Sequence, residues 1–266
     1  MRFSKKELKI LQKLSSEYKK INRYARYLDE DRVNVILTNG DLYLSDNMNG
    51  YMTTKSCDKY TRIIDIFSKD DSKETYLELL ENIDGNLKYV GVLKESSLEK
   101  ALDKKKFKIV REHHQTIKYL TDEFSNQDIT LYDLSDLDSK FILDFINENA
   151  PDANYTFKEI EKKKFSDFSF YLYGQDVIGV VIALRDNLEL YLEQIVIKKS
   201  HQGIGLGTKL LKQILFLAKD SQLERVRLHV YKDNFIAYNL YEKFGFKLDK
   251  VIAYWERNQW KEKSLD

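Results

Sequence analysis

The sequence predicts a mixed α+β protein, with a central twisted mixed β-sheet flanked by helices. Three observations lead to this prediction. Short segments in which apolar residues recur with a period of two are followed by segments with helical spacing. A glycine-rich loop joins such a strand to a helix in the C-terminal third of the chain. The same order of elements also occurs once in the N-terminal half, which suggests the hypothesis that the fold occurs twice in tandem.

Length and composition limit the class of protein. The 266 residues suffice for one large or two small domains, and a hydrophobic fraction of 42% suffices for packed cores. Lys and Arg number 44 against 43 Asp and Glu, so we expect no nucleic-acid partner. The single cysteine, Cys57, excludes an internal disulfide framework and a cysteine-rich metal site. With no signal peptide or membrane-spanning run in view, we expect a cytoplasmic monomer or homodimer without a membrane partner.

The N-terminal segments alternate between helix and strand patterns. Apolar residues recur every three or four positions over Ser4–Leu28, which predicts an amphipathic helix. From Val33 to Thr38 the pattern suggests a period of two, and Asn39-Gly40 is a dipeptide typical of tight turns. We therefore predict a hairpin whose second strand begins at Leu42.

Four segments of the N-terminal half follow the order seen around the glycine loop: Arg62–Phe67, Glu74–Ile83, Leu87–Leu93 and Ser97–Ile109. The position of the glycine loop is taken by a segment containing Asp70 and Asp71, whose carboxylates would repel an anion. We hypothesise that residues 1–125 form a degenerate copy of the fold that binds no cofactor. The alternative is an unrelated α+β domain.

The second domain is expected to span residues 126–266. Residues 111–127 are predicted to join the two halves, with a short helix reaching Leu120. Helices over residues 138–147 and 157–165 flank Pro151, with Phe141 expected to face inward. Strands are predicted over residues 168–173, 177–184, 195–197 and 226–231.

The loop after Ile197 has the chemistry of an anion site. First-turn amides of a helix have no intrahelical partner, and the helix dipole favours a negative charge there. Glycine allows the backbone to approach phosphate oxygens closely. A P-loop is excluded because Thr208-Lys209 follows Gly207 in the reverse order, and a dinucleotide fingerprint fails because Thr208 replaces its third glycine.

Two motifs resemble the GCN5-related N-acetyltransferase (GNAT) family. Gln202-Gly-Ile-Gly-Leu-Gly207 matches its pyrophosphate loop, Arg/Gln-x-x-Gly-x-Gly/Ala. The segment Asn234–Phe246 matches Asn-x-x-Ala-x-x-x-Tyr-x-x-x-Gly-Phe. The resemblance covers roughly residues 125–260 and implies a GNAT-like acyl-CoA N-acyltransferase fold, with acetyl-CoA as co-substrate and no metal. It also implies that two strands splay apart near Ile195 to admit the pantetheine arm.

The resemblance also assigns roles to individual residues. Tyr241 is implied as the general acid for the departing thiolate, and its usual pKa of about 10 keeps it protonated at neutral pH. The general base stays open between Glu193, His229 and a water relay. Asn234 is either a contact of the cofactor's arm or a helix N-cap. The implied cofactor-binding residues are Ile195, Val196, Ile197, Gln202, Gly203, Ile204, Gly205, Leu206, Gly207, Thr208 and Asn234.

The expected activity is direct transfer of an acetyl group to a primary amine of a small molecule or of a peptide or protein N-terminus. No covalent enzyme intermediate is expected, because Cys57 lies outside the second half. One alternative is a non-catalytic acyl-CoA-binding regulatory module. Another is aminoacyl transfer from tRNA, which the near-neutral charge disfavours.

Overall fold

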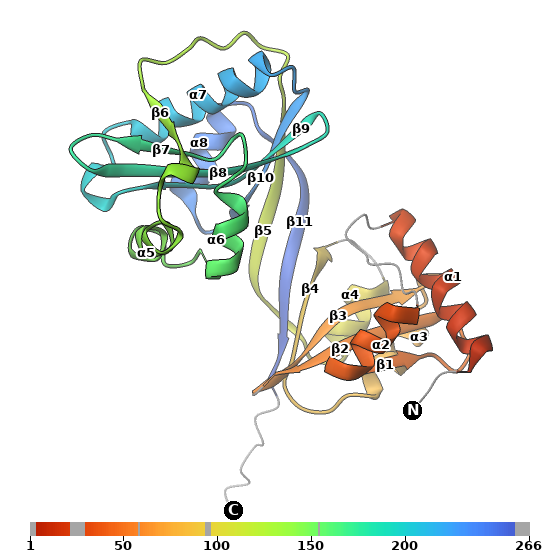
Figure 1. Cartoon of the computed structure of the whole chain (residues 1–266). Helices are drawn as coiled ribbons and strands as arrows, with labels where there is room; N and C mark the ends of the chain where they lie inside the picture. Colours follow the sequence, from red (N-terminus) through yellow and green to blue (C-terminus); the bar gives the residue numbers. More distant parts are fainter. Residues whose placement is uncertain (1–3, 22–29, 58, 94–96, 154, 259–266) are drawn as a thin grey trace, which may run out of the picture. The chain divides into compact units, whose positions relative to one another are not determined.

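The structure is a computed structural model that describes residues 4–21, 30–57, 59–93, 97–153 and 155–258 (Figure 1). Contacts divide the chain into two compact units. Unit 1 comprises residues 1–112 and 251–266, and unit 2 comprises residues 113–250. The chain therefore passes between the units within β5 (Lys108–Tyr119) and again within β11 (Lys247–Arg257). The division at residues 125 and 126 stays a prediction.

Unit 1 contains five strands in the order β1-β2-β3-β4-β11. Its elements are α1 (Lys5–Ile21), α2 (Glu30–Asn39), β1 (Leu42–Leu44), β2 (Gly50–Cys57), β3 (Tyr60–Ser68), α3 (Lys73–Glu81), β4 (Leu87–Leu93) and α4 (Ser97–Lys104). The predicted N-terminal helix is confirmed over α1, and residues 22–28 of that prediction lie outside the described part. Residues 251–257 of β11 pair antiparallel with β4, so the end of the chain completes this sheet.

The predicted strand over Val33–Thr38 is wrong, because these residues belong to helix α2. Val33 is buried, and Ile36 and Leu37 pack against the same apolar cluster. Their spacing of three and four is helical, whereas the short apolar run also allowed a period of two. Strand β1 pairs with β2 instead. Gly40 passes so close to β2 that a Cβ atom there would lie 1.8 Å from the carbonyl oxygen of Thr54.

Unit 2 contains the strand order β5-β10-β9-β8-β7-β6. Its elements are β6 (Leu131–Asp133), η1 (Leu134–Asp136), α5 (Ser139–Asn149), α6 (Phe157–Lys163), β7 (Phe170–Tyr173), β8 (Val177–Asp186), β9 (Glu189–Ile197), η2 (Lys199–His201), α7 (Leu206–Asp220), β10 (Arg225–Tyr231) and α8 (Phe235–Lys243). The predicted short helix before Leu120 is wrong. That segment is strand β5, whose residues 113–119 pair antiparallel with β10.

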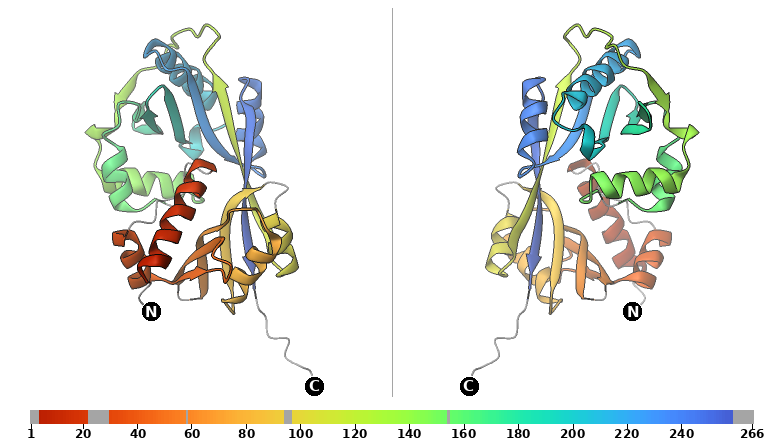
Figure 2. Two further views of the ribbon diagram at one scale, coloured as in Figure 1. Left: turned by 90° about the vertical axis from the view of Figure 1, so that its right-hand side faces the viewer. Right: turned by 90° about the vertical axis from the view of Figure 1, so that its left-hand side faces the viewer.

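Helices cover both faces of the unit 2 sheet (Figure 2). On one face α7 packs its apolar residues, such as Leu211 and Ile214, against Leu190 and Val226 of the strands. On the other face α5 and α6 pack against β8 and the C-terminal part of β9. Phe141 of α5 is 46% exposed, so the prediction that it faces inward is wrong.

The parallel pair β9–β10 separates halfway along its length. Pairing runs from Glu189 with Arg225 to Leu192 with Leu228 and then stops. Beyond this point β9 pairs only with β8, and β10 only with β5. Glu193 is the extra residue of a β-bulge, because Ala183 pairs with Leu192 and the preceding residue pairs with Gln194. The bulge bends β9 and opens a gap between residues 193–197 and residues 229–231.

Unit 1 repeats this local geometry. Strands β3 and β4 are parallel and pair only from Thr61 to Ile63 before they separate. Ile64 is the extra residue of a bulge against β2, directly after the last parallel pair. The turns after α4 and α8 also agree, because the amide of Phe107 donates to Leu102 O at 3.0 Å and that of Phe246 to Tyr241 O at 3.1 Å. These shared features support the hypothesis of a degenerate copy, which remains a proposal.

Candidate active site

The loop between β9 and α7 presents a row of unbonded amides. Gly205 is the N-cap of α7 at φ 86°, and Gly203 has φ 78°, a region of backbone conformation that favours glycine. Within the described residues, the backbone N–H groups of residues 203–208 form no hydrogen bond. The first amide with an acceptor is that of Lys209, which donates to Gly205 O at 3.0 Å. Such a row at a helix N-terminus suits a phosphate or pyrophosphate.

Gly207 gives an independent test of this fit. Its φ is not positive, and a Cβ atom built on it would meet no heavy atom within 4 Å. The chain itself therefore gives no steric reason for glycine at this position of α7. A small residue keeps the approach to the amides free for phosphate oxygens, and the loop pattern accordingly takes glycine or alanine at this position. The residues present thus fit a pyrophosphate group.

The other predicted cofactor residues lie around this loop. Gln202 ties the loop to the end of β9, because its Nε2 donates to Ile197 O at 2.9 Å. Residues 195–197 form the part of β9 that borders the gap. Asn234 is the N-cap of α8 and accepts a hydrogen bond from the amide of Ala237 at 3.2 Å. Its capping role is therefore realised through Oδ1, which leaves the side-chain NH₂ for a ligand.

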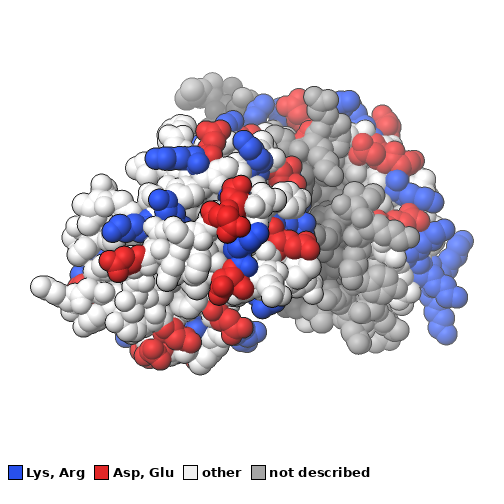
Figure 3. Space-filling view, turned by 90° about the horizontal axis from the view of Figure 1, so that it is seen from above, with Lys and Arg blue, Asp and Glu red and all other residues white. Residues whose placement is uncertain are grey.

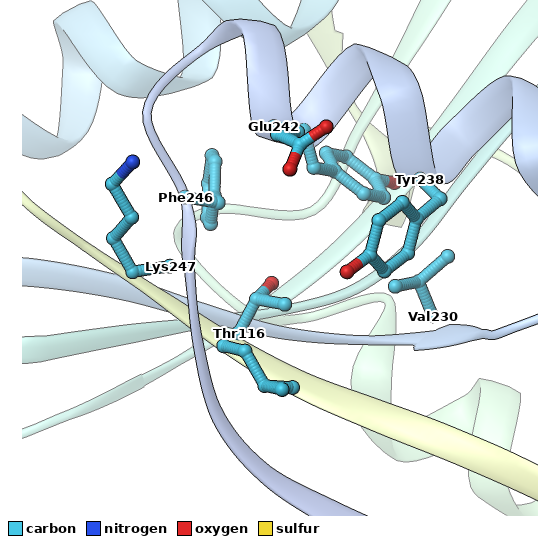
Figure 4. A pocket seen from close by; sticks show the side chains of 8 residues that line it. Thr116, Val230, Tyr238, Glu242, Phe246 and Lys247 are labelled. Atoms are coloured by element: carbon cyan, nitrogen blue, oxygen red, sulfur yellow. The ribbon is translucent and has the colours of Figure 1, made fainter.

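Tyr241 of α8 lines a small cavity of about 100 Å³. Figure 4 shows this cavity from close by. Val230, on the part of β10 that borders the gap, lines the same cavity, and Tyr238 reaches from α8 toward the strands. Burial raises the pKa of Tyr241 to about 12, so its hydroxyl keeps its proton at neutral pH. The Oγ1 atom of Thr116 is buried and has no partner in the described part of the chain.

Glu193 is engaged by helix α6. Its Oε1 accepts a hydrogen bond from Lys163 Nζ and forms an ion pair with it, and both side chains are largely buried. Its Oε2 is buried without a hydrogen-bond partner among the described residues. Burial and then the charge of Glu193 raise the pKa of Tyr155, whose ring centroid lies 5.2 Å from Lys163 Nζ. This carboxylate is therefore at the start of the gap but is already neutralised by a lysine.

His229 belongs to a chain of hydrogen bonds across four strands, β9, β10, β5 and β11. Its Nε2 lies 2.9 Å from Gln115 Oε1, and its Nδ1 lies 3.4 Å from the hydroxyl of Tyr191. Gln115 Nε2 in turn donates to Asp249 Oδ2 at 2.5 Å. Sequence reasoning identified His229 but missed the other three residues. Only the pairing of His229 with Gln115 across β10 and β5 brings these distant segments together.

A buried ion-pair cluster closes the paired end of β9 and β10. Glu189 is 4% exposed and accepts from Nε of Arg225 and Nε of Arg227, both at 2.7 Å. Burial alone would raise the pKa of Glu189, but hydrogen bonds and charge from the two arginines hold it below its usual value. The strands are thus held together immediately before they separate.

The described surface, helices and acidic side chains bear on the partners of the protein. Acidic and basic side chains are interspersed over much of the described face in Figure 3. In the described ranges, the helices are too short or too polar to cross a bilayer. The same residues contain no group of three or more His, Cys, Asp or Glu side chains placed to hold a metal ion.

Comparison with known proteins agrees with this geometry. Residues 132–246 match the model of the acetyltransferase (GNAT) family. The spermine/spermidine N(1)-acetyltransferase of Bacillus subtilis (strain 168) is 34% identical over 69 residues, which are 26% of this chain and 45% of that protein. The chain thus spans about half the length of this curated relative.

Two solved structures show the same fold over nearly the whole chain. A GCN5-related N-acetyltransferase from Sphaerobacter thermophilus has a TM-score of 0.66 at 10% identity, covering 93% of this chain and 91% of its own. A tandem GNAT protein from the clavulanic acid biosynthesis pathway has a TM-score of 0.58 at 10% identity, covering 95% and 94%. The fold is therefore a GNAT acyltransferase fold, and residues 132–246 match the model of the GNAT family.

Proposed function

We propose that unit 2 is an acetyl-CoA-dependent N-acetyltransferase that transfers an acetyl group directly to a primary amine. The acceptor is an amine of a small molecule or of a peptide or protein N-terminus. One observation carries the proposal: six consecutive amides without a hydrogen bond among the described residues, 203–208, follow β9, whose pairing with β10 stops at Leu192. The family match and the acetyltransferase relative support the same chemistry.

Residues 202–208 would hold the pyrophosphate, and the exposed backbone edge of residues 195–197 would receive the pantetheine arm. The described residues of unit 1 offer no second site of this kind. At its corresponding loop, Asp71 Oδ2 accepts from the amide of Ser97 at 3.1 Å, and Ser72 caps α3 by accepting from Thr75 N at 3.3 Å. Side chains of the loop thus occupy the place of an anion, and two carboxylates repel one. We therefore expect one acetyl-CoA per chain.

The chemistry requires a neutral amine and an acid for the departing thiolate. Tyr241 is proposed as this acid, because it lies beside the gap-lining Val230 and its raised pKa preserves the proton. The proton released by the amine goes to a base, for which Glu193 and His229 both border the start of the gap. Cys57 belongs to unit 1, so no step through an acetyl-cysteine is proposed.

A second candidate function is a non-catalytic acyl-CoA-binding module. The ion pair between Glu193 and Lys163 favours it, because it engages one carboxylate oxygen of a candidate base. The two functions differ in one measurable property. Both bind acetyl-CoA, but only the enzyme releases free thiol when an amine is added.

The test is an assay of thiol release from acetyl-CoA with a panel of amines that includes spermine and a short peptide. If unit 2 is an enzyme, release of free thiol depends on the amine. Gly205→Glu then abolishes the release by placing a carboxylate at the amides of residues 203–208, the anion cradle. Gly174→Glu is the matched control, because Gly174 lies in an exposed hairpin turn with room for a Cβ atom. Acetyl-CoA binding without release from any amine would favour the module. Release by Gly205→Glu at the wild-type rate would contradict the cradle.

A further inference from the structure

We infer that His229 accepts the proton of the attacking amine at Nδ1, and that Gln115 and Asp249 are positioning residues that fix its tautomer. The inference deepens the proposed function and rests on it. It selects one of the two candidate bases and assigns a role to two residues that no motif contains. Three observations support it: the directions of the hydrogen bonds, the position of His229 in the sheet, and the ion pair that holds Glu193.

The direction of each hydrogen bond follows from the Asp249 carboxylate. An ionised carboxylate only accepts, so the Gln115 amide turns its NH₂ group toward Asp249 Oδ2, 2.5 Å away. The amide oxygen of Gln115 then faces His229 Nε2 at 2.9 Å. Because an amide oxygen also only accepts, Nε2 must carry a hydrogen. A neutral imidazole has one N–H, so the lone pair is at Nδ1.

His229 is the first residue of β10 beyond its last pair with β9, and it is half-buried. Its Nδ1 is therefore at the start of the gap. The hydroxyl of Tyr191 lies 3.4 Å from Nδ1, which is long for a hydrogen bond from a hydroxyl, so an amine can replace this contact. Glu193, the other candidate, is held by Lys163. The lone pair of His229 is thus better placed to accept a proton.

Gln115 and Asp249 also stabilise the product of proton transfer without rearrangement. An imidazolium donates from both nitrogens, so Nε2–H keeps its acceptor on Gln115. Other charged or titratable groups face His229 from neighbouring strands. Arg227, whose guanidinium lies 4.3 Å from the ring centroid of Tyr191, is paired with Glu189, which limits its repulsion of an imidazolium. The ring of His229 contacts those of His113 of β5 and Tyr191 of β9. Tyr231 packs on His113, and Arg227, paired with Glu189, lies over Tyr191.

The transfer balances in atoms and protons. The amine lone pair attacks the thioester carbonyl carbon, a C–N bond forms and the C–S bond breaks. One amine proton passes to His229 Nδ1, and the thiolate takes the proton of the Tyr241 hydroxyl. Solvent then removes the proton from His229 and returns one to Tyr241, so the products are an amide and free CoA thiol.

The first test reads the tautomer directly and requires neither turnover nor a known acceptor. Long-range ¹H–¹⁵N spectra of the full chain distinguish the two neutral tautomers, and His229→Gln assigns its signal among the four histidines. We expect His229 of the wild-type protein to carry its proton at Nε2 and to be unprotonated at Nδ1. Asp249→Ala frees the Gln115 amide to rotate, so its spectrum should contain the Nδ1–H form. An Nδ1–H ring in wild type, or no change in Asp249→Ala, would overturn the positioning role.

The second test measures turnover of acetyl-CoA with spermine as the probe amine. We expect His229→Gln to lower kcat about 100-fold, and Asp249→Ala to lower it about tenfold and to move the acid limb of its pH profile. The KM for acetyl-CoA should be unchanged in both. Asp220→Ala, which removes an exposed carboxylate at the end of α7, is the matched control and should behave as wild type.

The outcomes separate the two proposals. Full activity of His229→Gln would overturn the assignment of the base while leaving the acetyltransferase in place. Failure of wild type to bind acetyl-CoA would overturn the proposed function, whereas the spectra would still decide whether Gln115 and Asp249 fix the tautomer.

Discussion

Replacing Gly207 by alanine separates the stability of the glycine loop from its binding role. Gly207 is the second residue of α7, has no positive φ and has open space where a Cβ atom would lie. Alanine is favoured over glycine in a helix by about 0.5–1 kcal/mol, with less in the first turn. We expect the free energy of unfolding to rise by about 0.5 kcal/mol and the Tm by about 1–2 °C.

Affinity for CoA should change little. The loop pattern takes glycine or alanine at the position of Gly207, so a single methyl group there should leave the amides open to phosphate oxygens, which approach them to about 2.9 Å. We expect the Kd for CoA to stay within about threefold of wild type, or about 0.7 kcal/mol.

Gly203→Ala is the matched comparison. It has the same open space, but its φ of 78° makes alanine unfavourable by about 1–2 kcal/mol. Chemical denaturation should therefore show Gly203→Ala less stable and Gly207→Ala more stable than wild type. Titration calorimetry with CoA measures both affinities. A loss of CoA affinity of about tenfold or more in Gly207→Ala would refute the reasoning, because the loop pattern would then not describe how these amides meet the ligand.

Two further changes test the acid and the ion-pair cluster. Tyr241→Phe should lower kcat about 100-fold with an unchanged Kd for acetyl-CoA. Because the pKa of Tyr241 is about 12, activity should not fall through loss of its proton below about pH 10, and a Tyr241-dependent decline near pH 8 would contradict this. Glu189→Gln leaves Arg225 and Arg227 poorly paired. It should lower the free energy of unfolding by about 3 kcal/mol at pH 7. Since the pKa of Glu189 is lowered, this stabilisation is present above about pH 4.5 and is lost as the pH falls below it, so an equal difference at pH 3 would contradict the ion pair.

Local chemistry explains which parts of the site could be predicted. The strand, loop and helix from Ile195 to Asp220 are encoded by residues that are neighbours in sequence, so spacing alone located the row of amides. The turn at Gly245 and the cap at Asn234 are local in the same way. The separation of β9 and β10 was expected from the family resemblance and is confirmed.

Long-range pairing explains what could not be predicted. Gln115 faces His229 only because β5 pairs with β10, and the sequence around residue 115 suggested a helix nearby. Lys163 pairs with Glu193, 30 positions away in the sequence. The three consecutive lysines at 162–164 give no indication of such a partner. Val33–Thr38 shows the converse problem. Four apolar residues within six positions fit both periods, and packing against α1 and β2 decides between them.

The most direct test of the account is calorimetric titration of the full chain with acetyl-CoA. The account predicts a single site per chain. Gly205→Glu removes this site, and substitution of Asp71 does not create a second one. Two equivalent sites would contradict the view that only unit 2 retains the cradle. No binding at all would mean that the amides of residues 203–208 do not hold a pyrophosphate, and the proposed function would fall with them.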